Sequence, residues 1–554
     1  MSPAIASATA AFLLLLLLSA ATLSVAEDPY LFFTWNVTYG TISPYGVPQQ
    51  VILINGQFPG PVINCTSNNN IVVNVFNHLD EPFLLSWNGI QQRKNSWQDG
   101  MPGTNCPIPP GQNFTYHWQP KDQIGSFYYF PTIGMHKAVG GYGPIRVHSR
   151  LLIPVPFDPP ADELDVLISD YYGRRHKDLS RLLDSGRHLT RPRGVLINGV
   201  GGPAGAAAAP IFAMEAGKVY RYRVCNVGMK ASLNFRIQGH KLKLVEMDGS
   251  HTVQNVYDSL DIHAGQCFSV LVAADQPPRD YFLVASTRFQ KTVQTATAVV
   301  RYAGSDTSAE EALPPAPTTW AWSLNQWRSF RWNLTASAAR PNPQGSYHYG
   351  QINITRTIKL ASSAGAVGSK LRFALNGVSH RDADVPLKLA EYFGINGKVF
   401  NYNLIGDEPP APATPITVTP NVITVEFRTF IEIILENPET SVQSYHLDGY
   451  SFFPVGMGPG KWLPESRRTY NLLDAVSRHT IQVYPKSWTA IMLTFDNAGL
   501  WNLRSEIWDR RYLGQQLYIS VLSPERSLRD EYNLPANALR CGAVVGLADP
   551  APYS

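Results

Sequence analysis

The sequence predicts an all-β protein built from three copies of one Greek-key β-barrel, and two observations lead to this prediction. The first is an internal repeat, because an apolar strand that ends at Asn-Gly occurs three times, at residues 52–56, 195–199 and 373–377. The second is the composition: 43 Pro, 42 Gly and 26 Tyr, with a charged fraction of 16%, are typical of β-rich domains. The length of 554 residues fits three or four domains of about 150 residues each.

The repeat continues beyond each Asn-Gly. In the first two copies, a strand with period-two alternation follows after about 20 residues, at 71–77 and 219–226. The third copy has its counterpart only at 424–437, so it carries an insertion. Further matching strands are expected at 84–89, 233–239 and 445–449, and aromatic-rich strands at 126–130, 281–285 and 500–503. We expect helices to be few and short.

Composition places the domain boundaries. Pro-rich stretches at 154–160 and 314–343 separate the copies. The predicted organisation is a signal peptide at 1–26, a first domain at 27–150, a second domain at 160–304, a Pro-rich linker at 305–369 and a third domain at 370–545.

The N-terminal residues predict export. An almost unbroken apolar run at 10–21 precedes Ser24-Val25-Ala26, which is the pattern of a signal peptide, and the run is shorter than a membrane span of about 20 residues. We therefore expect a secreted protein, and the end of the sequence predicts no membrane anchor. Export predicts N-glycosylation at Asn36, Asn64, Asn113, Asn333 and Asn353, which lie in Asn-x-Ser/Thr sequons.

Charge and cysteine content exclude some classes of function. The formal net charge is +4 and the basic residues are scattered, so the sequence offers no nucleic-acid-binding stripe. The simpler interpretation of this net charge is a weakly basic surface. The alternative is that the charge favours contact with a polyanionic neighbour such as cell-wall pectin. Five cysteines in an oxidising compartment predict up to two disulfides, and without a CxxC pair a structural zinc site of the usual spacing is not expected.

Short phrases within the repeats resemble a known family. They are Asn-Gly-Gln-Phe-Pro-Gly-Pro at 55–61, Gly-Ser-Phe-Tyr-Tyr at 125–129, Gly-Met at 134–135 and Trp-Thr-Ala at 488–490. With the three repeats, they are similar to plant ascorbate oxidase and other multicopper oxidases along essentially the whole mature chain. The resemblance implies three cupredoxin-like (plastocyanin-like) barrels. In copper-binding members, a type 1 copper on a Cys thiolate and two His passes electrons to a trinuclear copper cluster.

Almost all the residues that would bind copper are replaced. The ten histidines, the cysteine and the axial methionine of the family correspond here to Ser86, Asn88, Phe130, Thr132, Gln443, His446, Asp448, Arg504, Ser505, Glu506, Arg510 and Gln515. Only His446 is retained, and the hydroxyl of Ser505 cannot supply the thiolate that a type 1 copper needs. The sequence therefore predicts no copper cofactor, or at most one copper, and no oxidase activity.

The replacements predict a polar network in place of the trinuclear cluster. Arg504 can pair with Asp448 or Glu506, which would neutralise a buried site without metal, and His446 would then be a hydrogen-bonded core residue. Two alternatives stay open. The two carboxylates and His446 could hold one harder cation, or Asp448 and Glu506 could act as general acid and base of a hydrolase.

The cysteines can be assigned in part. The resemblance implies a disulfide between Cys106 and Cys541, which would join the first and third domains. Cys225 and Cys267 fall in predicted strands of the second domain and could pair, which would leave Cys65 unpaired.

The resemblance is to plant proteins that have lost copper ligands, the skewed-growth and pollen-specific subgroup. It implies a secreted, apoplastic cell-wall glycoprotein without oxidase activity, with a role in wall expansion or pollen-tube growth. The expected partner is a cell-wall polysaccharide or an extracellular protein, and not nucleic acid or a membrane. The alternatives are an ascorbate-oxidase-like oxidoreductase that retains a single copper, which would need His446, and the hydrolase described above.

Overall fold

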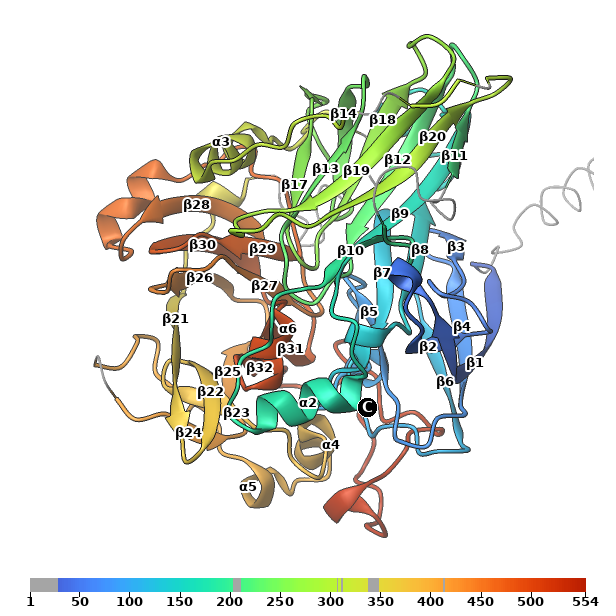
Figure 1. Cartoon of the computed structure of the whole chain (residues 1–554). Helices are drawn as coiled ribbons and strands as arrows, with labels where there is room; N and C mark the ends of the chain where they lie inside the picture. Colours follow the sequence, from blue (N-terminus) through green and yellow to red (C-terminus); the bar gives the residue numbers. More distant parts are fainter. Residues whose placement is uncertain (1–27, 203–210, 306, 310–311, 337–347, 412–413) are drawn as a thin grey trace, which may run out of the picture.

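The computed structural model describes residues 28–554 except 203–210, 306, 310–311, 337–347 and 412–413. The predicted signal peptide at 1–26 therefore lies outside the described residues. Figure 1 shows three β-rich domains, coloured blue, green, and yellow to red along the chain.

The first domain contains two four-stranded sheets with the orders β2-β1-β4-β6 and β3-β8-β7-β5. Their inner faces enclose one core that includes Trp35, Trp87 and Tyr129, all buried. The strands are β1 (Tyr30–Ile42), β2 (Gln49–Ile54), β3 (Ile63–Thr66), β4 (Asn70–Asn77), β5 (Leu85–Asn88), β6 (Asn113–Trp118), β7 (Gly125–Pro131) and β8 (Gly143–His148).

The second domain has sheets ordered β10-β9-β12-β18-β14-β15 and β11-β20-β19-β13-β17, and β16 pairs with β14. The strands are β9 (Asp162–Tyr171), β10 (Gly194–Ile197), β11 (Ile211–Met214), β12 (Val219–Asn226), β13 (Leu233–Ile237), β14 (Leu242–Met247), β15 (Ser250–His251), β16 (Val256–Tyr257), β17 (Leu260–Ile262), β18 (Cys267–Ala273), β19 (Asp280–Thr287) and β20 (Thr295–Tyr302).

The third domain has sheets ordered β24-β23-β22-β21-β26-β30-β28 and β25-β32-β31-β27-β29. The strands are β21 (Arg356–Val367), β22 (Lys370–Leu375), β23 (Val378–His380), β24 (Thr417–Thr419), β25 (Val422–Glu426), β26 (Phe430–Asn437), β27 (Gln443–Leu447), β28 (Phe453–Pro459), β29 (Thr480–Val483), β30 (Ser487–Thr494), β31 (Gly499–Ser505) and β32 (Gln516–Leu522).

The same pairings recur in all three domains. The first strand of each domain pairs antiparallel with the next strand and parallel with a strand further along the chain, as in β1–β2 and β1–β4. A second parallel pair, β3–β8 in the first domain, also has counterparts in the other two. The structure thus contains the predicted three copies of one β-barrel.

The Asn-Gly repeat marks one turn that is built three times. Asn55, Asn198 and Asn376 all have φ near +50°, and the glycine that follows each has a φ between 73° and 82°, so both turn positions are left-handed. In each copy the Asn Oδ1 accepts a hydrogen bond from a backbone N–H of the first strand, at 2.7–2.8 Å. Its Nδ2 donates to a carbonyl oxygen of the same strand, at 2.7–2.9 Å. The repeat therefore reflects a side chain that joins the turn to its neighbouring strand.

The predicted linker at 305–369 is wrong at its C-terminal end. Helix α3 (Trp320–Ser329) lies within it, and β21 is a full strand of the third domain that pairs with both β22 and β26. Ile358 and Leu360 face the core, while the rest of β21 is rich in Ala, Ser and Gly. Because small residues carry little hydrophobic pattern, the strand was not recognised from the sequence.

Helices are short, and two of them, α4 and α5, lie in the insertion of the third copy. The α-helices other than α3 are α2 (His176–Asp184), α4 (Leu387–Tyr392), α5 (Asn396–Val399) and α6 (Trp508–Tyr512); the 3₁₀ helices are η1 (Pro44–Gly46), η2 (Ser96–Gln98), η3 (His136–Val139), η4 (Tyr349–Gln351), η5 (Pro464–Thr469) and η6 (Gly542–Val544). Among the described residues, no helix is long and apolar enough to cross a membrane.

Contacts between distant segments fix the domains to one another. The Cys106–Cys541 disulfide ties the first domain to the C-terminal segment across 435 residues, and Cys225–Cys267 joins two paired strands of the second domain. The remaining Cys65 is buried, and burial raises the pKa of its thiol to about 12, so it is not a reactive nucleophile.

Candidate functional site

The positions that correspond to the family's trinuclear cluster lie together between the first and third domains. Strand β5 supplies Ser86 and Asn88, β7 and the residue after it supply Phe130 and Thr132, β27 and the residue after it supply His446 and Asp448, and β31 and the residue after it supply Arg504 and Glu506. Pairing places Ser86 opposite Phe130 and His446 opposite Arg504. None of the eight is more than 3% exposed. We call these eight residues the former cluster positions.

An ion network occupies the centre of the former cluster positions. Arg504 donates to Asp448 at 2.5 Å and to Glu506 at 2.9 Å, so the expected pairing occurs with both carboxylates at once. Its guanidinium also lies 5.5 Å from the Phe130 ring centroid. Every charge in this set is buried, so each one depends on its partners for stabilisation.

Lys137 completes the network, and sequence reasoning missed it. This residue of η3 is buried, donates to Glu506 at 3.1 Å, and lies 4.8 Å and 4.9 Å from the ring centroids of Phe130 and Trp508. Burial lowers the pKa of Lys137, while the Glu506 charge opposes that shift. The phrase Gly-Met-His-Lys at 134–137 marks the position, but only the fold brings it to Glu506.

Asp99 adds a third carboxyl group beside Asp448. Burial and the neighbouring Asp448 charge raise the pKa of Asp99 well above its usual value, which favours the neutral form of this acid. Burial, the largest single influence, would raise the pKa of Asp448, but the Arg504 charge and the contacts with Arg504 and His446 together outweigh burial and lower it. Burial acts in the same direction on Glu506, and there Lys137, Arg504 and His446 together lower the pKa. The network is therefore two cations facing two carboxylates, with the carboxyl group of Asp99 beside them.

The retained His446 is a core residue held by neighbours. Its Nδ1 lies 2.7 Å from Thr480 Oγ1 and its Nε2 lies 3.0 Å from Asp448 Oδ1. The ring of His479 lies 5.1 Å away, centroid to centroid, and burial lowers the pKa of His479 to about 4. Sequence reasoning did not place His479 here, because it belongs to none of the matched motifs.

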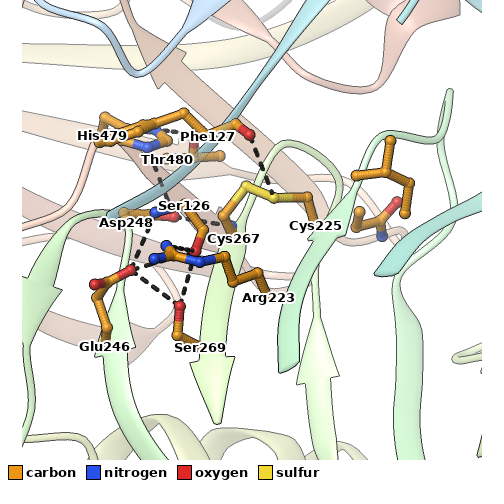
Figure 2. Close-up of a disulfide and its surroundings, with 12 residues drawn as sticks. Ser126, Phe127, Arg223, Cys225, Glu246, Asp248, Cys267, Ser269, His479 and Thr480 are labelled. Carbon is orange, nitrogen blue, oxygen red and sulfur yellow. Dashed lines mark hydrogen bonds and ion pairs between the residues drawn. A yellow bond between two sulfur atoms is a disulfide. The ribbon is translucent and has the colours of Figure 1, made fainter. Parts of the chain in front are cut away.

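Figure 2 shows Asp248 of the second domain between the Cys225–Cys267 disulfide and His479 of the third domain. Asp248 accepts a hydrogen bond from the backbone N–H of Cys267 at 3.0 Å, and its other oxygen accepts from Arg478 at 2.6 Å. Asp248 also lies 3.7 Å from His479 Nε2. The Cys225–Cys267 disulfide therefore helps to fix the carboxylate that faces His479.

Copper does not fit the former cluster positions. Copper needs thiolate or neutral imidazole ligands, whereas one histidine remains and two buried cations, Arg504 and Lys137, occupy the centre. The side chains of Ser86 and Asn88, in the places of two histidines, offer only a hydroxyl and an amide. The positive charges of Arg504 and Lys137 would also repel the single harder cation that was the alternative for Asp448, Glu506 and His446.

The positions that correspond to the type 1 copper are also filled. Gln515 donates to Gln443 at 2.5 Å and to the Tyr445 hydroxyl at 2.5 Å. Arg510 forms a bidentate pair with Glu439 at 2.8 and 2.6 Å. The hydroxyl of buried Ser505 accepts from the backbone of residue 507 at 3.2 Å. The amides, the guanidinium and the hydroxyl at these positions offer no soft ligand for copper.

The hydrolase hypothesis receives no support from the geometry. Asp448 and Glu506 are 3% and 0% exposed, so an oligosaccharide cannot reach them. Both carboxylates are ionised and share Arg504, so neither can serve as the general acid that glycoside hydrolysis requires.

A second cluster, away from these positions, has metal-ligating side chains. Glu81, His136 and His176 place one ligand atom each within 4.8 Å of the others. Glu81 Oε1 lies 2.5 Å from His176 Nε2 and 3.3 Å from His136 Nε2, and it accepts a hydrogen bond from the Tyr39 hydroxyl. No local motif links these residues, which lie 55 and 40 positions apart in the sequence.

A basic groove of about 640 Å³ lies between the first domain, the third domain and the C-terminal segment. Two carboxylates, Asp496 and Asp530, lie among its basic side chains, and Tyr30 and Tyr532 are 55% and 47% exposed. The basic residues that line this groove are Arg93, Lys94, Lys121, Arg428 and Arg529. These residues are scattered through the sequence, so no basic patch could be predicted from it, but the fold brings them together in one groove.

Comparison with known proteins agrees with the geometry of the barrels. Three models described as multicopper oxidase match residues 36–151, 162–305 and 384–527. The chain belongs to the multicopper oxidase family. It is 64% identical over 533 residues to an L-ascorbate oxidase homolog of Nicotiana tabacum, in an alignment that covers 96% of each chain.

More distant multicopper oxidase relatives also match along their length. The monocopper oxidase-like protein SKU5 of Arabidopsis thaliana is 48% identical, covering 96% of this chain and 92% of the relative. An L-ascorbate oxidase of Cucumis sativus is 29% identical, covering 94% of each. The crystal structure of Fet3p, a multicopper oxidase that functions in iron import, superposes with a TM-score of 0.74 at 18% identity, covering 89% of this chain and 90% of that one. At this identity the superposition shows the shared fold alone.

Proposed function

We propose that this protein is an exported cell-wall glycoprotein that does not oxidise substrates and acts by binding acidic wall polysaccharide in the basic groove. The groove is the observation that carries this proposal, because five Lys and Arg side chains face two carboxylates in one concavity. The ion network at the former cluster positions is the reason why we propose no oxidase activity.

The chemistry of the groove suits a chain of sugar carboxylates. Lys121 and Arg529 are exposed, and Lys94 lies 5.4 Å from the ring centroid of Tyr532. Exposed tyrosine rings offer flat apolar faces to sugar rings, while cations pair with carboxylates. Arg93 is already paired with Asp496 at 2.9 Å, so Lys121 and Arg529 are the residues that we expect to contact ligand.

Export and glycosylation are consistent with this role. Two disulfides are typical of proteins that fold in an oxidising compartment. Asn36, Asn64, Asn113 and Asn353 are exposed and open to glycosylation, whereas Asn333 is half-buried, with Thr335 hydrogen-bonded to its Oδ1. A wall-binding protein of this kind would act in wall expansion or pollen-tube growth. An extracellular protein partner is the alternative occupant of the groove.

Binding of polygalacturonate, measured by titration at low and moderate salt, tests the proposal. Lys121→Glu with Arg529→Glu should weaken binding about tenfold or more, because each change removes a cation and adds a repulsive charge. The matched control is Lys243→Glu with Lys291→Glu, which makes the same charge change on exposed residues of the second domain. If both double variants bind alike, or if neutral dextran binds as well as polygalacturonate, the groove is not the binding site.

A further inference from the structure

The cluster of Glu81, His136 and His176 connects two domains. Glu81 lies in the loop between β4 and β5, and His136 begins η3, so both belong to the first domain. His176 is the first residue of α2, in the second domain. The rings of the two histidines lie 4.8 Å apart, centroid to centroid, and the histidines are 2% and 4% exposed.

Both imidazoles direct the same ring nitrogen at one carboxylate oxygen. His136 and His176 each place Nε2 near Glu81 Oε1, and that oxygen also accepts from Tyr39. A zinc ion bonds imidazole nitrogen at about 2.0–2.1 Å, so the ligand atoms around it lie roughly 3.3 Å apart. The 3.3 Å between Glu81 and His136 already fits this spacing, and the 2.5 Å between Glu81 and His176 needs to lengthen by less than about 1 Å.

The ligand set selects the class of metal. Two imidazoles and one carboxylate suit zinc and the neighbouring divalent transition metals, whereas calcium and magnesium take oxygen ligands. The Tyr39 hydroxyl, already bonded to Glu81, would orient this carboxylate as a metal ligand. The cluster is separate from all twelve positions that correspond to copper ligands in the family.

One neighbouring cation limits the affinity without blocking the site. Lys177 Nζ lies 3.7 Å from Glu81 Oε2, whereas both histidines contact the other carboxylate oxygen, Oε1. Its shorter contact, 3.1 Å, is to Asp80. Because Lys177 is 43% exposed, it can remain with Asp80 when a metal binds Glu81.

We propose that Glu81, His136 and His176 bind one zinc-class divalent ion, and that this ion fastens α2 of the second domain to the first domain. The other end of α2 already contacts the third domain, where Asp184 pairs with Lys370 and accepts from Tyr512 at 3.0 Å. Figure 1 shows α2 running between the blue-to-cyan and the yellow parts of the molecule. The ion would therefore fix a helix that touches all three domains.

Zinc titration of chelator-treated full-length protein tests the proposal directly. Wild type should bind one Zn²⁺ per chain by calorimetry, and Zn²⁺ should raise its melting temperature, because the ion binds only the folded protein. His136→Gln and His176→Gln should each lower the affinity by at least about tenfold, since each removes one of three ligands. His446→Gln is the matched control, a buried histidine outside the cluster, and should bind Zn²⁺ as wild type does.

Two outcomes would overturn the proposal. One is no stoichiometric Zn²⁺ uptake by wild type, and the other is equal uptake and equal stabilisation in the His136→Gln and His176→Gln variants. Should either glutamine variant fail to fold, Co²⁺ bound to wild type supplies a second measurement. Intense visible bands of a four-coordinate ion support the site, whereas the weak bands of six-coordinate Co²⁺ contradict it.

Discussion

Arg504 is the counter-charge of buried Asp448, and it shares buried Glu506 with Lys137. It is fully buried, as is Glu506, and Asp448 is 3% exposed. A buried pair of this kind contributes little net stability compared with a well-packed apolar set, but removal of one partner is costly because the remaining charge stays in a medium of low dielectric constant. The arginine is therefore the residue on which the integrity of the former cluster positions depends.

Substitution Arg504→Gln should destabilise the protein by about 3–5 kcal/mol at neutral pH. The pKa values of Asp448 and Glu506 are lowered in the folded state, so their pairing contributes stability above the ordinary carboxyl range near pH 4 and loses it as the pH falls further. The difference between variant and wild type should therefore shrink in acid. Chemical denaturation at pH 7 and at about pH 2.5, below the ordinary carboxyl range, measures both effects.

The control for this substitution is Arg301→Gln. Arg301 is 46% exposed and paired with Asp280 at 2.8 Å, so its loss should cost at most about 1 kcal/mol. Equal losses for the two variants, or an Arg504→Gln difference that grows in acid, would show that the buried network does not carry the stability assigned to it.

Residues within the family motifs could be predicted to meet, and others could not. The sequence placed Arg504 with Asp448 and Glu506 because each replaces a ligand whose neighbours the resemblance supplies. Lys137 and Asp99 lie outside those motifs, and only the packing of η2 and η3 against the third domain brings them in. Long-range juxtaposition of single residues leaves no periodic signal in one sequence.

At the scale of elements, the Asn-Gly turn explains why the fold could be predicted. Each copy needs a side chain with both a donor and an acceptor in the left-handed region, and Asn provides both. The turn therefore recurs in the sequence wherever a barrel begins. By contrast, β21 lacks a strong alternation of apolar residues, and α4 and α5 belong to an insertion that the other copies do not share.

The Cys106–Cys541 disulfide should matter more than Cys225–Cys267 for the C-terminal segment. That segment packs on the first domain through contacts such as Trp97 Nε1 donating to the Tyr532 carbonyl oxygen at 2.9 Å. In the chain-entropy model, closing a span of 435 residues is worth about 2 kcal/mol more than closing one of 42. We expect Cys106→Ser with Cys541→Ser to expose residues 523–554 to protease.

Limited proteolysis followed by mass spectrometry checks this expectation. The matched control is Cys225→Ser with Cys267→Ser, which removes the other disulfide. The control should leave cleavage after residue 523 unchanged, and the prediction is wrong if the Cys106→Ser, Cys541→Ser variant keeps its C-terminal segment as resistant as wild type.

At the scale of the whole molecule, the family fold is intact, while eleven of the twelve positions that correspond to copper ligands carry other residues. The three barrels superpose on a multicopper oxidase with a TM-score of 0.74, yet both sets of copper positions hold hydrogen-bonded polar side chains. The concave surface between the first and third domains is instead positively charged. This contrast is the reason why we propose a function for the surface of the molecule and not for its buried junction.

The most direct measurement is oxygen consumption with ascorbate by copper-incubated protein from a eukaryotic host, together with the copper content per chain. We predict no oxygen uptake above that of the buffer with the same free copper, and no thiolate-to-copper absorption, because Ser505 stands at the cysteine position. Copper bound without turnover agrees with this prediction, since Glu81, His136 and His176 form a separate site. Sustained oxygen uptake with several coppers per chain, lost in His446→Gln, would contradict it.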